Sequence, residues 1–259
     1  MADQASHRRI VFVTAGGPHP WIIANALIAR FGPMPAIVED QEPKSALIRR
    51  RIRHQGWLSA LGQLATMVLV RLGKRLFEGR VAAIVEAEGL ATEPTAGQEI
   101  IRVASVNDPA FGVALDRLKP DLLFLTGCRL LKRDVLDRIA CPVLNYHAGI
   151  TPAYRGMNGG YWALASGDVD NFGGTVHLVD AGIDTGGVLG QVRGKPAPGD
   201  NLMTYAYRQA AMSRSIAVAA VEAVLAGQAR PFEPGGRSKL WFHPPVWSYV
   251  WTGLTRGVW

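Results

Sequence analysis

The sequence predicts an α/β fold in which one mostly parallel sheet is covered by helices on both faces. Segments typical of strands alternate with segments typical of helices along most of the 259 residues. Most of the strand segments are continuous apolar runs, as expected for strands that are buried on both faces. Apolar residues make up 48% of the chain, which is enough for a sizeable core.

The first half of the chain opens with a strand, a glycine turn and a helix. The apolar run at residues 8–17 ends in Gly16 and Gly17, and residues 19–32 then repeat apolar side chains at helical spacing up to a glycine. We then expect a strand at residues 35–40, a helix at 81–90 and a second strand at 99–106. A helix at 108–120 follows, which starts with Asp108 and Pro109.

The second half continues the alternation and ends in a segment of different composition. We expect a strand at residues 121–127, a short helix at 131–139 and a strand at 142–147. Two short strands around a loop follow at 173–192, and a long helix at 201–227. These elements place one domain at residues 1–230 and a C-terminal appendage at residues 231–259.

The appendage holds four of the seven tryptophans among prolines and glycines. We expect it to be too broken for a helix, and too apolar to remain a free tail. It should therefore be docked, either on the domain or on a second copy of the chain as part of a homodimer.

The positive charge of the chain is concentrated in one stretch. Residues 44–80 hold nine Lys or Arg and one acid, whereas the whole chain has a net charge of +7, so the remainder is nearly neutral. Within this stretch, residues 57–70 carry no charge and are too few to span a bilayer. We expect a helix whose apolar face packs on the protein while the arginines stay solvated.

Two alternatives remain open for this basic stretch. One is a nucleic-acid patch, for which the cluster of Arg49, Arg50, Arg51 and Arg53 supplies the cations. The other is peripheral contact of residues 49–75 with an anionic membrane surface. Because the basicity is local, we do not expect nucleic acid to be a partner of the protein as a whole.

Several function classes are disfavoured by missing motifs. The six histidines are scattered and no cysteine pair has zinc spacing, so we expect no metal. The nucleophile elbow of serine hydrolases, the Walker loop and the complete dinucleotide fingerprint are all absent. The first residues contain no apolar stretch suited to a secretory signal, and Cys128 and Cys141 sit near apolar runs, so we expect a reduced, cytoplasmic setting.

Polar side chains gather at the ends of the expected strands between Asn145 and Asp184. Asn145 and His147 end the strand at 142–147, His177 lies within the next strand, and Asp184 follows it. Ligands bind at the carboxyl ends of strands in open α/β sheets. An amide and an imidazole side by side can direct two donors at a developing oxyanion, and a carboxylate can keep the imidazole protonated. This pattern favours acyl transfer without a covalent nucleophile.

The segment "NYHAGITPAYRG" followed by "DAGIDTGG" resembles the folate-dependent formyltransferase family. Its hallmark is N-x-H-x-x-x-x-P-x-Y-R-G, with an aspartate of a D-x-G motif at the distance that separates His147 from Asp184, 37 residues. The resemblance implies a Rossmann-like fold, an enzyme, and 10-formyltetrahydrofolate as co-substrate. It also implies Asn145 and His147 as oxyanion donors and Asp184 as the group that supports His147 and moves protons.

The resemblance also implies the binding residues. The segment "TGCRLL" matches the family's pterin-binding segment in position, so the folate would lie against Cys128, Arg129, Leu130 and Leu131, with Asp180 on the other side. The acceptor amine would contact five residues, Gly16, Gly17, Tyr154, Arg155 and Asn158.

Departures from the family pattern bear on the acceptor. The chain has "HAGITP" where the family usually has H-P-S-L-L-P, it lacks the phosphate-binding turn of the purine-pathway members, and about thirty residues follow Arg230 where the tRNA-specific members carry a β-barrel. We therefore expect a small amine, in particular a nucleotide-linked amino sugar. The alternatives are hydrolysis of the same folate, and a protein that keeps the fold without turnover and holds a membrane or a partner.

Overall fold

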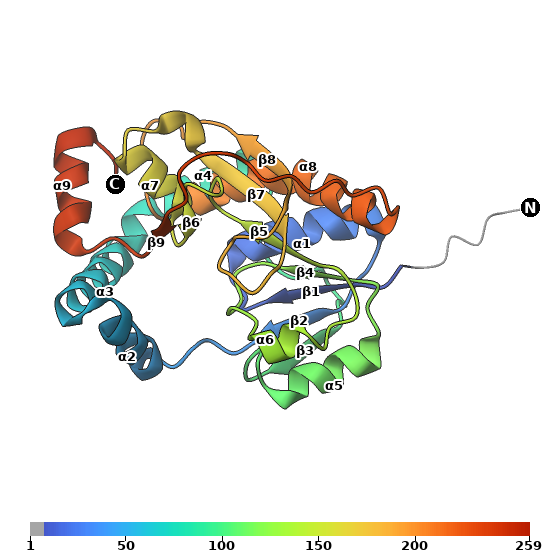
Figure 1. The fold of residues 1–259 in the computed structure, drawn as a ribbon. Helices are drawn as coiled ribbons and strands as arrows, with labels where there is room; N and C mark the ends of the chain where they lie inside the picture. Colours follow the sequence, from blue (N-terminus) through green and yellow to red (C-terminus); the bar gives the residue numbers. More distant parts are fainter. Residues whose placement is uncertain (1–7) are drawn as a thin grey trace, which may run out of the picture.

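The computed structural model describes residues 8–259 and contains a seven-stranded sheet in the order β3-β2-β1-β4-β5-β7-β8 (Figure 1). The expectation about a secretory signal rests on residues that lie partly outside this range. The first five strands in this order run parallel, and β7 and β8 run antiparallel to their neighbours. The strands are β1 (Ile10–Thr14), β2 (Ala36–Glu39), β3 (Ile100–Val103), β4 (Leu122–Leu125), β5 (Val143–His147), β7 (Gly173–Leu178) and β8 (Val188–Arg193). The predicted α/β fold with a mostly parallel sheet is confirmed.

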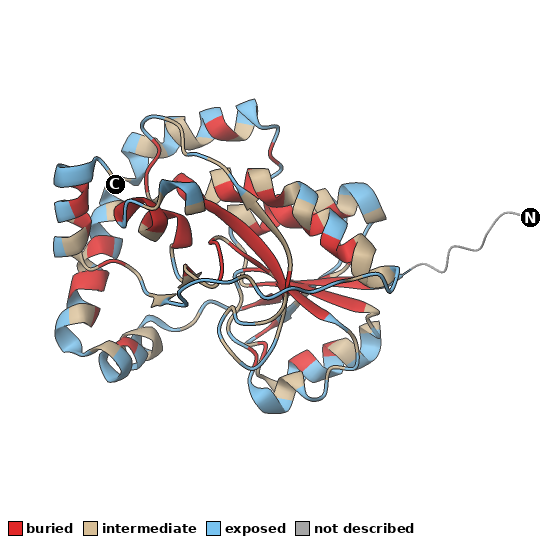
Figure 2. Cartoon of the chain, turned by 45° about the horizontal axis from the view of Figure 1, so that its top comes forward, coloured by how far each residue is buried: buried red, intermediate tan, exposed pale blue. Residues whose placement is uncertain are grey.

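Helices cover both faces of the sheet, with one cluster of buried residues on each face, and a third cluster lies around Tyr161, Phe172 and Tyr249. Figure 2 shows the buried residues along the strands and on the helices that cover them. One face packs against α1 (Pro18–Phe31), α4 (Lys74–Ala87) and α8 (Tyr205–Leu225). The other packs against α5 (Pro109–Leu118) and the short α6 (Arg133–Leu136). Adjacent strand residues therefore serve different clusters, as with Phe12 and Val11, because successive side chains of a strand point to opposite faces.

Two local signals that the sequence carries are present at the helix starts. Gly16 and Gly17 have φ of 82° and 100°, a conformation that favours glycine, and they turn the chain from β1 into α1. Asp108 caps α5, since its side chain accepts a hydrogen bond of 2.9 Å from the N–H of Ala110.

The prediction that residues 231–259 are too broken for a helix is wrong, because α9 spans Val246–Arg256. The prolines of the appendage precede this helix, and Pro245 stands at its N-cap, where a missing N–H costs nothing. The appendage is docked on the domain, as expected: β9 (Leu240–Trp241) pairs with β6 (Arg155–Gly156), and Trp241 stacks on Trp162 at a centroid distance of 4.5 Å. Trp162 belongs to α7 (Gly159–Ala165), and a 3-10 helix at Val169–Asn171 follows α7.

The prediction that residues 57–70 pack their apolar face on the protein is also wrong. These residues lie in α3 (Trp57–Leu72), which follows α2 (Lys44–Gln55), and α3 buries Ala60, Gly62, Gln63 and Thr66 while its large apolar side chains are exposed. The reason is the contact with α9: Gly62 leaves the space that the Trp247 ring fills. Arg51, expected to be solvated, is buried in α2.

Among the described residues, no helix is long and apolar enough to cross a membrane.

Candidate active site

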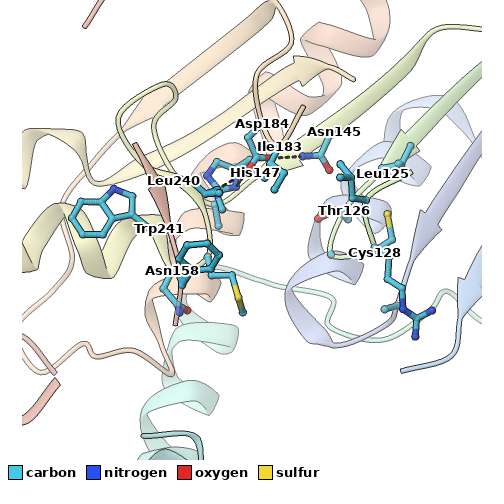
Figure 3. Close-up of a pocket in the computed structure, with 18 of the residues that line it drawn as sticks. Leu125, Thr126, Cys128, Asn145, His147, Asn158, Ile183, Asp184, Leu240 and Trp241 are labelled. Atoms are coloured by element: carbon cyan, nitrogen blue, oxygen red, sulfur yellow. Dashed lines mark hydrogen bonds and ion pairs between the residues drawn. The ribbon is translucent and has the colours of Figure 1, made fainter. Parts of the chain in front are cut away.

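Four polar side chains meet at the carboxyl end of β5. Asn145 and His147 are two residues apart on this strand and so point to the same side of the sheet. His177 on β7 is the antiparallel partner of Asn145, and Asp184 reaches the group from the loop after β7, where its φ is 51°. The Asp184 carboxylate lies 3.5 Å from His147 Nδ1, 3.4 Å from His177 Nε2 and 3.4 Å from Asn145 Nδ2 (Figure 3). We refer to these four residues as the polar cluster.

The imidazole of His147 is held at both nitrogens. Its Nε2 lies 2.6 Å from the carbonyl oxygen of Tyr154, and because a carbonyl can only accept, Nε2 carries a proton. A proton on Nδ1 would then form an ion pair with Asp184. A Cβ on Gly149 would lie 2.5 Å from His147 Nε2 and 2.5 Å from the Tyr154 oxygen, so only glycine leaves room for this bond. This contact explains why "HAGITP" has glycine at position 149.

The Asp184 carboxyl is buried and ionised. Burial raises its pKa, but the nearby His147, the contact with His177 and the backbone N–H of Gly156 outweigh it and hold the pKa well below its usual range. The N–H of Gly156 donates to Asp184 Oδ2 at 2.8 Å. Arg155 fastens the same loop by donating to the carbonyl oxygen of Ile183 at 2.9 Å. The Arg-Gly pair of the motif therefore positions the carboxylate.

His177 is a member of the polar cluster to which the sequence assigned no role. Its Nδ1–H donates to the carbonyl oxygen of Leu178 at 2.7 Å, and its Nε2 lies 3.1 Å from Asn145 Nδ2 and 3.4 Å from the Asp184 carboxylate. His177 therefore helps to hold both the Asn145 amide and the carboxylate in place. The role of His177 follows from the pairing of β5 with β7, which depends on tertiary structure and cannot be read from either strand segment alone.

The polar cluster opens into a cavity of about 1070 Å³. All five residues that the resemblance assigns to folate line this cavity: Cys128, Arg129, Leu130, Leu131 and Asp180. The guanidinium of Arg129 is turned away to Glu39, at 2.8 Å from Oε2, and Glu39 is fully buried beneath it. Burial, with a contribution from Glu39, raises the pKa of the Cys128 thiol to about 12, so this thiol stays protonated.

The residues expected at the acceptor divide into two groups. Asn158 lines the cavity, with its amide Nδ2 at 2.8 Å from His243 Nδ1. Gly16 and Gly17 are not among the lining residues, although their neighbours Ala15 and His19 are. Tyr154 and Arg155 are also outside the lining.

The side chain of Tyr154 points away from the cavity. Its hydroxyl donates to Asp168 at 2.8 Å and its ring stacks on Trp241. The contribution of Tyr154 to the site is therefore its carbonyl oxygen, which holds His147. Arg155 likewise acts through the Asp184 loop.

Helix α2, helix α3 and the appendage contribute cavity residues that sequence reasoning missed: Arg50, Arg51, His54, Gln55, Gln63, Leu240, Trp241 and Phe242. Figure 3 shows Leu240, Trp241 and Asn158 on one side of the polar cluster and Thr126 and Cys128 on the other. Within the part of the chain that the structure describes, buried Arg51 has no carboxylate in ion-pair range, whereas Arg50 pairs with Glu42 at 2.8 Å. The described residues contain no group of three or more His, Cys, Asp or Glu placed to hold a metal ion.

Comparison with known proteins gives one family. The family model described as formyl transferase matches residues 61–221. The chain is 27% identical over 173 residues to a methionyl-tRNA formyltransferase of Chlorobium chlorochromatii, covering 66% of this chain and 55% of that protein. It is 40% identical over 121 residues to a phosphoribosylglycinamide formyltransferase of Mycobacterium tuberculosis, covering 45% and 54%. The chain thus spans about half the length of these curated relatives.

The same fold occurs in solved structures of low sequence identity. A sugar N-formyltransferase from Shewanella superposes with a TM-score of 0.57 at 12% identity, covering 90% of this chain and 76% of that chain.

Proposed function

This chain belongs to the formyl transferase family, and from that premise we propose that it transfers the formyl group of 10-formyltetrahydrofolate to a primary amine of a small substrate. The observation that carries the proposal is the polar cluster, which lines a large cavity. Its Asp184 carboxylate lies 3.5 Å from His147 Nδ1 and 3.4 Å from Asn145 Nδ2.

The end of the cavity near Cys128 suits the pterin ring. Because Arg129 is drawn to Glu39 and the Cys128 thiol is neutral, this wall presents backbone groups and the apolar side chains of Leu130 and Leu131. A flat heterocycle with N–H and carbonyl groups matches such a wall, since the rings pack on apolar side chains while the edges bond to the backbone. When bound, 10-formyltetrahydrofolate supplies a formyl carbon that is open to attack by an amine.

The polar cluster then performs two tasks. Asn145 Nδ2 directs one hydrogen at His177 and the other at Asp184 Oδ1, 3.4 Å away. Because the second contact is long, this hydrogen would instead stabilise the formyl oxygen as charge develops on it. The 3.5 Å between His147 Nδ1 and Asp184 is longer than a good hydrogen bond, so a proton on Nδ1 would be shared with a formyl oxygen that lies beside the carboxylate. Asp184, ionised in the free protein, would accept the amine proton directly or through water as the new C–N bond forms. The departing folate nitrogen receives a proton in exchange.

The acceptor we propose is an amino sugar linked to a nucleotide. Its support is the side of the cavity formed by α2, where Arg50, Arg51 and His54 line the wall. A buried arginine without a carboxylate partner in the described chain is suited to hold a phosphate, because the guanidinium presents several donors to an anion.

A panel assay tests the proposal. Purified protein is mixed with 10-formyltetrahydrofolate and, separately, with nucleotide-linked amino sugars, glycinamide ribonucleotide, Met-tRNA or no amine, and formylated product is detected by mass. We expect product from an amino-sugar nucleotide and a large loss of rate in Asn145→Ala, about 10²–10³-fold as for other oxyanion donors. Product only from glycinamide ribonucleotide or Met-tRNA would refute the acceptor. Release of formate with no amine present would show a hydrolase.

A further inference from the structure

Helix α3 is exposed on the side that carries its large apolar side chains. Trp57 is 68% exposed, Leu72 is 77% exposed, and Leu76 at the start of α4 is 82% exposed. The exposed apolar residues of this stretch are Trp57, Leu58, Leu61, Leu64, Met67, Val68, Leu69, Leu72 and Leu76. Helix α9, which packs on α3, adds Trp247, Trp251 and Leu254. We call these twelve residues the apolar face. Figure 1 shows α2, α3 and α9 together at one side of the molecule, away from α5.

The arrangement of α3 is the reverse of that in a core helix. The residues it buries are small or polar, Ala60, Gly62, Gln63 and Thr66, while the residues with the most apolar surface face outward. The burial is specific, since Gly62 receives Trp247 and Thr66 Oγ1 donates to the Gly62 carbonyl oxygen at 3.2 Å. Monomeric proteins rarely expose a contiguous apolar surface of this kind unless it binds something.

Cations are exposed on the helices next to α3. Lys44, Arg49 and Arg53 are exposed in α2, which contacts α3 through Arg51 and Met67, and Arg71, Lys74 and Arg75 are exposed where α3 ends and α4 begins. Within the residues 8–259, none of these six side chains forms an ion pair. Glu78 is the one acid from Lys44 to Arg80. The surface therefore combines uncovered apolar area with uncompensated positive charge.

Charge decides between the occupants of such a surface. A second copy docked by a twofold axis would bring the same cations against each other, which opposes association. A nucleic acid would match the cations but leave the leucines and tryptophans in water. An anionic bilayer satisfies both, because apolar side chains enter the boundary of the acyl chains while Lys and Arg meet the phosphates.

We propose that the apolar face docks on an anionic phospholipid bilayer, with α3 lying in the plane of the membrane. Helix α3 has 16 residues, and no helix of the described chain can cross a membrane, so the contact is peripheral. The proposal rests on the surface alone and is independent of the proposed formyl transfer. Because Arg50 and Gln63 of α2 and α3 also line the cavity, docking would place that side of the cavity near the lipid headgroups.

Vesicle flotation tests the proposal. The full chain is mixed with vesicles of phosphatidylcholine and phosphatidylglycerol at about 0.15 M salt, with vesicles of phosphatidylcholine alone, and with the mixed vesicles at about 1 M salt. We expect the protein to float with the mixed vesicles at the lower salt, and the bound fraction to fall about tenfold or more in the other two conditions. Tryptophan emission should shift to shorter wavelength on binding, because Trp57 and Trp251 leave water.

Two variants and two matched controls separate the parts of the surface. Trp57→Ser/Leu61→Ser/Leu72→Ser removes apolar area from exposed positions, and Arg71→Gln/Lys74→Gln/Arg75→Gln removes three cations; each should lower the bound fraction about tenfold or more. Val113→Ser, at an exposed apolar position on α5, and Lys132→Gln/Arg133→Gln/Arg138→Gln, which removes the same charge elsewhere, should float like the wild type. Circular dichroism checks that each variant is folded.

Three results would overturn the proposal. The first is the absence of flotation with anionic vesicles. The second is flotation that survives both surface variants or falls equally in the two controls. The third is a dimer in analytical ultracentrifugation that the Trp57→Ser/Leu61→Ser/Leu72→Ser variant abolishes while the wild type fails to float, which would assign the apolar face to a second copy of the chain.

Discussion

The polar cluster and helix α3 differ in which side chains they shield from water. In the polar cluster, polar side chains are shielded and contact one another, as when His147 is held by the Tyr154 carbonyl and faces Asp184. In α3, large apolar groups are exposed and a glycine is buried against Trp247. Burying polar groups and exposing apolar groups both cost free energy. Both regions therefore depart from what folding alone favours, which is typical of parts of a protein that serve a function.

The largest effect is expected where a side chain is removed from the polar cluster. His147→Ala should lower turnover by at least about a hundredfold, because the oxyanion loses a donor and Asp184 loses the imidazole it faces. Steady-state kinetics with the acceptor found in the panel measures the loss. Near-normal turnover in a folded variant would show that the polar cluster is not the reactive centre. Its shielded polar side chains would then have no catalytic explanation.

A buried glycine on α3 gives the next effect. Gly62→Ala should destabilise the fold by about 1–3 kcal/mol, since the new methyl group would clash with the rings of Trp247 and Pro245. Gly79→Ala is the matched control: it also lies in a helix, but its Cβ would meet no atom within 4 Å, so it should stabilise by about 0.5–1 kcal/mol. Urea unfolding measures both. Equal effects of the two substitutions would mean that α9 does not pack on the small face of α3.

The half-buried His19, which lines the cavity, should make the protein sensitive to acid. Burial lowers the pKa of His19 from 6.5 to about 4, so below pH 6.5 the unfolded chain binds this proton while the folded chain does not. Stability from His19 is complete above about pH 7 and should fall by about 2 kcal/mol by about pH 5. His19→Leu should remove this part of the pH dependence of urea unfolding. A pH dependence unchanged by the substitution would contradict the burial of His19.

The smallest effect is expected on the apolar face. Leu72→Ser/Leu76→Ser should change the free energy of unfolding by no more than about 0.5 kcal/mol per residue, because both side chains are already in water. Thermal unfolding without lipid is the measurement. A loss of several kcal/mol would show that these leucines are packed in solution, either on the chain itself or on a second copy.

The sequence predicted the sheet and the three motif residues because their signals are local. Continuous apolar runs mark the buried strands, and the spacing of Asn145, His147 and Asp184 is read directly from the chain. The roles of His177 and Gly149 were not predicted, because these roles come from contacts across the fold, with Asn145 on a paired strand and with the Tyr154 carbonyl.

The errors in α3 and α9 have one origin. The apolar pattern of residues 57–70 predicts a helix correctly, but it does not say which face meets the protein. That face is set by Trp247 of α9, a helix whose own existence was hidden by the prolines before it. Gly62 and Trp247, which are 185 residues apart, determine each other's packing, and the sequence of either segment alone does not contain this coupling.

The central claim, that ionised Asp184 supports the reaction from within the polar cluster, is tested most directly by Asp184→Asn. The substitution keeps the size of the side chain and removes the charge that faces His147 and His177. Formyl transfer from 10-formyltetrahydrofolate should fall at least about a hundredfold in kcat, with KM for the folate changed little. Asp137→Asn, at an exposed carboxyl after α6, should keep wild-type kinetics. A folded Asp184→Asn protein with kcat within a few-fold of the wild type would contradict the account.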